Sequence, residues 1–177
     1  MSSREFDEIP DSLKGISEEQ QIIFAKVMVR FPLDEKTLEV IILKAHLIME
    51  EVIRTLITEH VQFPKAVDEA RLNCSQAINI SEALLRNRTE EPWIWMAAHK
   101  LNKIRNHMAH NLEPEGLDDR IEDIISYIDV NFSQRQDNKD KHEGMDTLSR
   151  FRINMFLLLI LFFELSKRKP ELLEVEF

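Results

Sequence analysis

The chain has little of the residues that crosslink small secreted proteins or interrupt helices. Its 177 residues include one cysteine, Cys74, with three glycines and six prolines. A single cysteine excludes an intramolecular disulfide and a metal site built from several cysteines, and a reduced thiol fits a cytoplasmic protein. The scarcity of glycine and proline favours long helices joined by short connections.

Long hydrophobic runs are also missing. The longest one, residues 155–163, is far shorter than the ~20 residues that span a bilayer. Residues 1–12 have no apolar core of the kind that a secretory signal needs. We therefore expect a cytoplasmic protein without a membrane segment.

Basic residues are outnumbered as well, with 23 Lys and Arg against 32 Asp and Glu, and the net charge is −9. This charge balance disfavours an extended nucleic-acid-binding surface, because affinity for phosphates comes mainly from Lys and Arg. It leaves room for a local site, since basic residues outnumber acidic ones between Arg86 and Arg105.

Apolar residues recur at helical spacing along most of the chain, which predicts an all-α fold. We expect an up-and-down helical bundle of about five to six helices that dimerises through its helices. Residues 1–16 are expected to form an N-terminal arm, residues 17–170 a single helical domain and residues 171–177 an acidic tail. Helices are predicted at residues 17–31, 35–59, 65–78, 93–110, 117–128 and 146–169, with Ser81 capping a short turn.

The last of these helices is apolar all round from Met155 to Phe163. A helix of this kind must be buried on every side. Burial is easier when a second subunit covers part of it, so we expect a homodimer.

Polar chemistry is concentrated in residues 100–114, which read KLNKIRNHMAHNLEP. On a straight helix His99, Lys103, Asn106 and His110 follow one another at spacings of four, three and four, and so share one stripe. Arg105 and His110 are five residues apart and point about 140° away from each other. They can converge only where the helix ends or bends, or on a substrate lying across the helix end.

The segment Leu101 to His110 resembles the signature of the HEPN superfamily, in which an Arg and a polar residue precede a His by a short gap. Here Arg105, Asn106 and His110 supply that pattern, with four residues between Arg and His. The resemblance implies a helical, metal-independent endoribonuclease that cleaves RNA in a dimer cleft, as a toxin or an antiviral (abortive-infection) effector. Arg105, Asn106 and His110 would be catalytic.

The resemblance also implies supporting residues and partners. Lys103, His107 and His99 would assist in binding the RNA substrate, and an antitoxin or regulatory protein would be a further partner. A toxin subgroup carries a modified Tyr two residues after the His, but Leu112 stands there in this chain. No cofactor and no metal site are expected, because no His-x-x-x-His pair or nearby carboxylate set accompanies the motif.

The residue types suit the chemistry. Histidine is the side chain most often used for proton transfer near neutral pH, so His110 is the candidate for that role. Arg105 can hold a phosphate with two hydrogen bonds and stabilise charge at phosphorus. Asn106 can bind a phosphate oxygen or orient His110. One histidine cannot be base and acid at once, so a second motif across the dimer would supply the acid.

The spacing alone is unspecific. Arg54 with His60 and Arg135 with His142 also satisfy an Arg-to-His gap of this size, without the polar neighbour pattern of the HEPN signature. His46 and Glu50, one turn apart on the 35–59 helix, are interpreted as a solvated edge. Because a polar residue of the second helix reaches the cleft in the superfamily, Glu50 is also a site candidate.

Other functions stay open. The main alternative is a non-catalytic helical dimer that acts as a protein-interaction or regulatory module. In that case Arg105 would form an ion pair with Glu113 or Glu115, and His110 would cap its own helix. The acidic surface suits such a module. A third hypothesis, a nucleic-acid-binding regulator, is disfavoured because the chain has no basic recognition helix.

Overall fold

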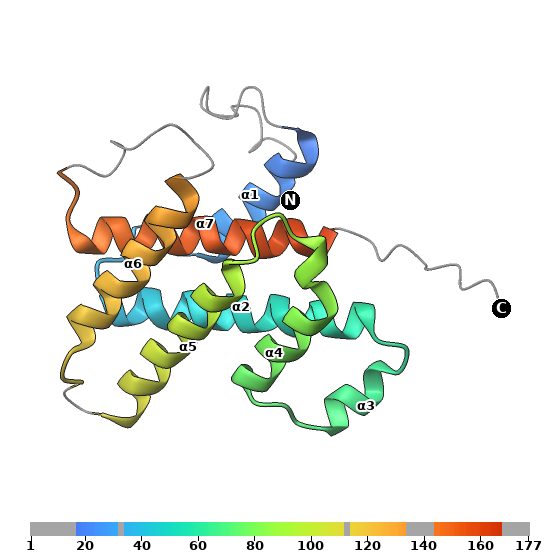
Figure 1. Ribbon diagram of the computed structural model, residues 1–177. Helices are drawn as coiled ribbons and strands as arrows, with labels where there is room; N and C mark the ends of the chain where they lie inside the picture. The colour runs from blue at the N-terminus through green and yellow to red at the C-terminus, as the bar shows by residue number, and fades with distance from the viewer. Residues whose placement is uncertain (1–16, 32–33, 112–113, 134–143, 168–177) are drawn as a thin grey trace, which may run out of the picture.

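A computed structural model describes residues 17–31, 34–111, 114–133 and 144–167, and these residues are helical almost throughout, with no strand among them (Figure 1). The predicted all-α class is confirmed. The predicted N-terminal arm, the acidic tail and His142 lie outside the described residues. In the part of the chain that is described, no helix is long and apolar enough to cross a membrane.

Seven α-helices and one 3₁₀ helix are present among the described residues, against the five to six helices predicted. They are α1 (Glu18–Arg30), α2 (Leu38–His60), α3 (Pro64–Glu69), α4 (Cys74–Leu85), the 3₁₀ helix η2 (Arg86–Arg88), α5 (Ile94–His110), α6 (Leu117–Ser133) and α7 (Thr147–Lys167).

The extra helix arises because the predicted helix at residues 65–78 is two helices. The chain breaks at Arg71, whose φ of 48° lies in the left-handed region. Asn73 then starts α4 with a reciprocal cap, in which its side chain accepts from the Gln76 backbone and the Gln76 side chain accepts from the Asn73 backbone. The prediction for Ser81 was wrong, because Ser81 lies buried inside α4 and its hydroxyl donates to the Ile53 carbonyl.

Two long helices form the centre of the molecule. α2 and α7 pack along each other, and α1 packs on α7 (Figure 1). α4 and α5 cover another side of α2, and α6 bridges α5 and α7. The arrangement places the α5 motif helix directly against α2 and α4.

α7 is buried along most of its surface within one chain. Its buried residues include Phe151, Met155, Leu158, Phe162 and Leu165, and they pack against α1, α2, α5 and α6. The predicted burial on every side is found only in part, because Phe156, Leu157 and Ile160 are only partly buried. Most of this helix is therefore covered without a second subunit. The homodimer stays a prediction, and its remaining basis is the resemblance.

Candidate functional site

The motif residues lie on α5, one continuous helix that ends at His110, close to its predicted bounds. Pro92 precedes the helix, and Trp95, Leu101 and Ile104 anchor it in the core. Trp95 packs edge-on against Phe162 of α7. The two tryptophans before and at the start of this helix, Trp93 and Trp95, are both buried.

Arg105 and Asn106 form a hydrogen-bonded pair on this helix. The Arg105 Nη1 donates to the Asn106 Oδ1 over 2.9 Å, and both residues are half-buried. Among the described residues Arg105 forms no ion pair, so the predicted alternative of a pair with Glu115 is not found; Glu113 lies outside the described part. The guanidinium is thus oriented by an amide instead of being neutralised by a carboxylate.

The positive charge of Arg105 lies close to α2 and α4. It acts electrostatically on His46 of α2 and on Cys74 of α4. Asn102 stands three residues before Arg105 and four before Asn106, so the three side chains share one face of α5. That face is directed at α2, because Asn102 contacts His46.

His110 lies apart from Arg105. It is the last residue of α5 and is exposed, and its side chain forms no hydrogen bond among the described residues. Since the helix continues unbroken to His110, the two side chains keep their separation of about 140° around the axis. One chain alone does not bring them onto a common face.

The predicted substrate-binding residues have different surroundings. Lys103 is exposed. His99 Nε2 lies 3.0 Å from the Asn79 Oδ1 on α4, and burial lowers the pKa of His99. His107 Nε2 donates to the Glu115 carbonyl over 2.9 Å and so secures the connection to α6. Of the three, only Lys103 is exposed without a side-chain hydrogen bond to another described residue.

His46 was predicted at a solvated edge, and this prediction was wrong. Its ring is fully buried, with 0% of its surface exposed. The ring nitrogen Nε2 is 3.1 Å from the Asn102 Oδ1. Burial lowers the pKa of His46 below 6.5, and the nearby Arg105 charge lowers it further, while Asn102 and Glu50 act in the opposite direction.

Glu50 and Cys74 complete a polar cluster with His46. One Glu50 oxygen accepts two hydrogen bonds from Arg54, at 3.1 and 2.7 Å, while the other lies 3.8 Å from the His46 Nδ1. Burial, together with the Glu50 charge, raises the pKa of the Cys74 thiol to about 11. Without a bound cation Cys74 is therefore an uncharged thiol at neutral pH.

The three residues have side chains that can hold a metal ion, although no metal site was predicted. His46, Glu50 and Cys74 are the one such group found in the part of the chain that is described. The available signal was the position of His46 among Ile42, Ala45 and Met49, on the apolar face of the predicted helix. The contribution of Cys74 has no sequence signal, because it depends on how α4 packs against α2.

A scan against models of protein families, and searches of characterised proteins and of solved structures, found no match to this chain.

Proposed function

We propose that this protein is a metal-independent endoribonuclease of the HEPN type, acting as a toxin or antiviral effector. The observation that carries the proposal is the arrangement of the motif on α5. Arg105 is oriented by its hydrogen bond to Asn106 and forms no ion pair with a described carboxylate, and His110 is exposed at the end of the same helix. An oriented cation and an accessible histidine are the groups that cleavage of RNA requires.

The reaction uses the ribose itself as nucleophile. A histidine removes the 2′-hydroxyl proton, the 2′-oxygen bonds to phosphorus, and the bond from phosphorus to the 5′-oxygen breaks. A second histidine protonates the leaving 5′-oxygen. Arg105 stabilises the negative charge that gathers on the phosphate oxygens. The products are a 2′,3′-cyclic phosphate and a 5′-hydroxyl.

The proposed cleft lies between two copies of the chain. On a single α5 helix Arg105 and His110 point about 140° apart, so they meet most simply when the helix ends of two chains face each other across the RNA. Two symmetric motifs also supply both the base and the acid. We therefore place Arg105 and Asn106 of one chain opposite His110 of the other.

The charge of the molecule fits a small site. A net charge of −9 disfavours an extended phosphate-binding surface. Lys103, exposed one turn before His107, is the residue best placed to add a local phosphate contact. RNA would thus be held at a few phosphates near the end of α5, consistent with recognition of a defined loop instead of a long duplex.

The proposal is tested by incubating purified protein with total RNA and with tRNA in EDTA. We expect cutting that leaves cyclic phosphate ends, reduced about 10²- to 10⁴-fold by His110→Ala and about 10²- to 10³-fold by Arg105→Ala. His142→Ala is the matched control, since His142 follows Arg135 at a similar spacing outside the motif. Cutting that survives both motif substitutions would contradict the proposed site.

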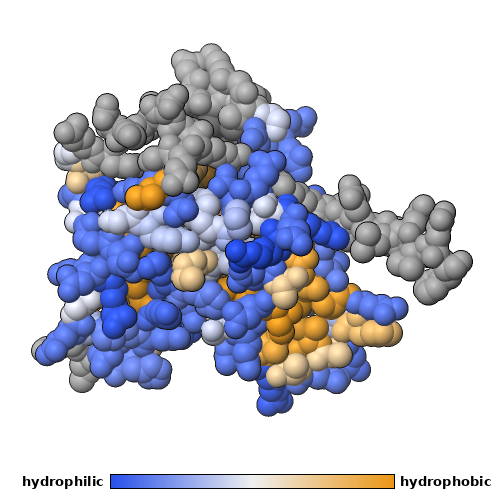
Figure 2. All heavy atoms as spheres, in the orientation of Figure 1, coloured by the Kyte–Doolittle hydropathy of each residue, from blue (hydrophilic) through white to orange (hydrophobic). Residues whose placement is uncertain are grey.

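A second candidate function is a non-catalytic module that binds a protein partner. It is favoured by exposed apolar side chains away from the motif. Figure 2 shows apolar residues gathered over α4 and its approach to α3 on an otherwise hydrophilic face. Phe63 and Leu84, on these segments, are 70% and 39% exposed. A folded protein that cuts no RNA in the assay above would support this function.

A further inference from the structure

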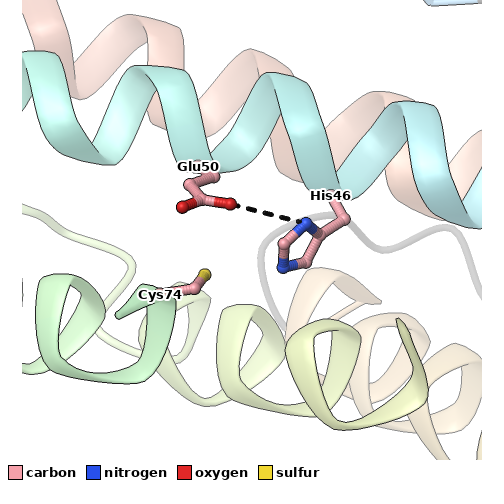
Figure 3. Close-up of side chains that lie close together, drawn as sticks. All are labelled: His46, Glu50 and Cys74. Carbon is pink, nitrogen blue, oxygen red and sulfur yellow. Dashed lines mark ion pairs between the residues drawn. The ribbon is translucent and has the colours of Figure 1, made fainter. Parts of the chain in front are cut away.

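A group of potential metal ligands lies between α2 and α4, beside the motif but separate from it. The ligand atoms of His46, Glu50 and Cys74 all lie within 4.8 Å of one another. His46 and Glu50 stand one turn apart on α2, and Cys74 is the first residue of α4. Figure 3 shows the two α2 side chains and the Cys74 sulfur directed into the same space between the helices.

The His46 ring is oriented as a metal ligand would be. Its Nε2 faces the Asn102 carbonyl oxygen at 3.1 Å. That oxygen only accepts hydrogen bonds, so Nε2 carries the proton and Nδ1 keeps its lone pair. Nδ1 is buried and has no hydrogen-bond partner among the described residues. Leaving a buried nitrogen unpaired costs free energy, and a bound cation would remove this cost.

The group nearest to this lone pair is also an acceptor. The second Glu50 oxygen lies 3.8 Å from Nδ1, too far for a hydrogen bond. The first oxygen is held by Arg54, which also donates to the Leu72 carbonyl. Arg54 therefore fixes the carboxylate with one oxygen turned to His46 and Cys74. Two acceptors that face each other across a gap leave a position that suits a cation.

We propose that His46 Nδ1, Glu50 Oε2 and Cys74 Sγ bind one zinc ion, with Asn102 and Arg54 orienting two of the ligands. Imidazole, carboxylate and thiolate together are a ligand set typical of zinc. The Cys74 thiol releases its proton to solvent on binding, so one thiolate and one carboxylate balance the two charges of the ion. The fourth tetrahedral position is left to a water molecule.

The distances agree with this assignment after a small movement. Zinc bonds of about 2.0 to 2.3 Å place tetrahedral ligand atoms roughly 3.3 to 3.7 Å apart. The cluster spans up to 4.8 Å, so its side chains must close by about 1 Å. Glu50 is partly exposed and Cys74 begins a helix, so both side chains can adjust. The ion would tie the start of α4 to the middle of α2.

This inference goes beyond the proposed function, and its test uses no RNA. Full-length protein is stripped with EDTA, dialysed, and titrated with Zn²⁺ by calorimetry and with Co²⁺ by absorption spectroscopy. We expect one ion per chain, a thiolate-to-cobalt charge-transfer band, and a higher melting temperature with zinc. EDTA should lower the melting temperature again.

Variants locate the site. Cys74→Ser should abolish the charge-transfer band, and Cys74→Ser and Glu50→Gln should each weaken zinc binding by more than the ~10- to 100-fold expected for Asn102→Ala, which only orients His46. Glu51→Gln is the matched control, because Glu51 is an exposed neighbour on α2 that pairs with Arg30. Circular dichroism checks that each variant is folded.

Two results would overturn the inference. The first is a wild-type protein that binds no zinc. The second is zinc binding that Cys74→Ser leaves unchanged, which would assign the ion to an adventitious surface site such as the exposed histidine at the end of α5.

Discussion

At the scale of single residues, the decisive feature is a buried histidine that the sequence placed in solvent. His46 and Asn102 come from helices far apart in the sequence, and the His46 Nε2 is hydrogen-bonded to the Asn102 Oδ1 inside the core. The motif residues Arg105 and Asn106 were identifiable because their types and spacing carry chemistry. The pairing of His46 with Asn102 was not identifiable, because it depends on which faces of the two helices pack together.

Replacing Asn102 should destabilise the protein more than an equivalent change at the surface. Asn102→Ala leaves the buried His46 N–H without an acceptor, so we expect the free energy of unfolding to fall by about 1 to 3 kcal/mol. Urea denaturation measures this change. The control is Asn79→Ala, which removes the same type of bond, to His99, at an exposed position. Equal losses in the two variants would show that the buried bond has no special role.

His46 should also make stability depend on pH. Burial holds its pKa below 6.5 in the folded state, so the neutral ring contributes fully above 6.5, and this contribution is lost as pH falls through the folded-state pKa. The groups that face the ring are Glu50, Cys74, Asn102 and Arg105. In EDTA, the unfolding free energy of wild type should drop between about pH 7.5 and about pH 5.5.

The reference for this measurement is His46→Gln, which removes the titrating ring. Its unfolding free energy should change less over the same pH interval than that of wild type, whatever its absolute stability. Two profiles with the same slope would mean that other groups cause the pH dependence.

At the scale of elements, long amphipathic helices were predictable and a break between two short ones was not. α2, predicted at residues 35–59, spans Leu38–His60, and α7, predicted at 146–169, spans Thr147–Lys167. Their apolar stripes are long enough to define them. Across α3 and α4 the apolar spacing continues through the turn at Arg71, so the prediction missed the start of α4 and with it the setting of Cys74.

The cap at Asn73 should be what defines that start. Asn73→Ala removes the acceptor for the Gln76 backbone N–H, and we expect a loss of about 1 kcal/mol, or a melting temperature lower by about 2 to 4 °C. Thermal unfolding followed by circular dichroism measures it. Asn87→Ala, at an exposed asparagine in η2, should leave the melting temperature within error. A neutral Asn73→Ala would show that packing alone fixes the α3–α4 turn.

At the scale of the whole molecule, the open question is what completes the α5 motif. Most of the apolar α7 is covered within one chain, so its burial gives little evidence for a partner. In the proposed function a partner is needed for chemical reasons, because Arg105 and His110 diverge on a single helix and the proposed cleavage requires both a base and an acid. The sequence predicted these residues and the angle of about 140° between them. The way in which two chains would pack together could not be predicted from the helical spacing of apolar residues.

The most direct test of a shared cleft is to mix active and inactive chains. Wild-type chains are combined with an equal amount of His110→Ala chains, allowed to exchange subunits, and assayed for RNA cleavage in EDTA, with light scattering to verify that both are dimers. If the base and the acid are the His110 residues of two chains, only pairs of two wild-type chains keep an active cleft, and activity should be roughly a quarter of that of wild type at the same total concentration. Activity of one half, as expected when each chain holds a complete site, would contradict the account.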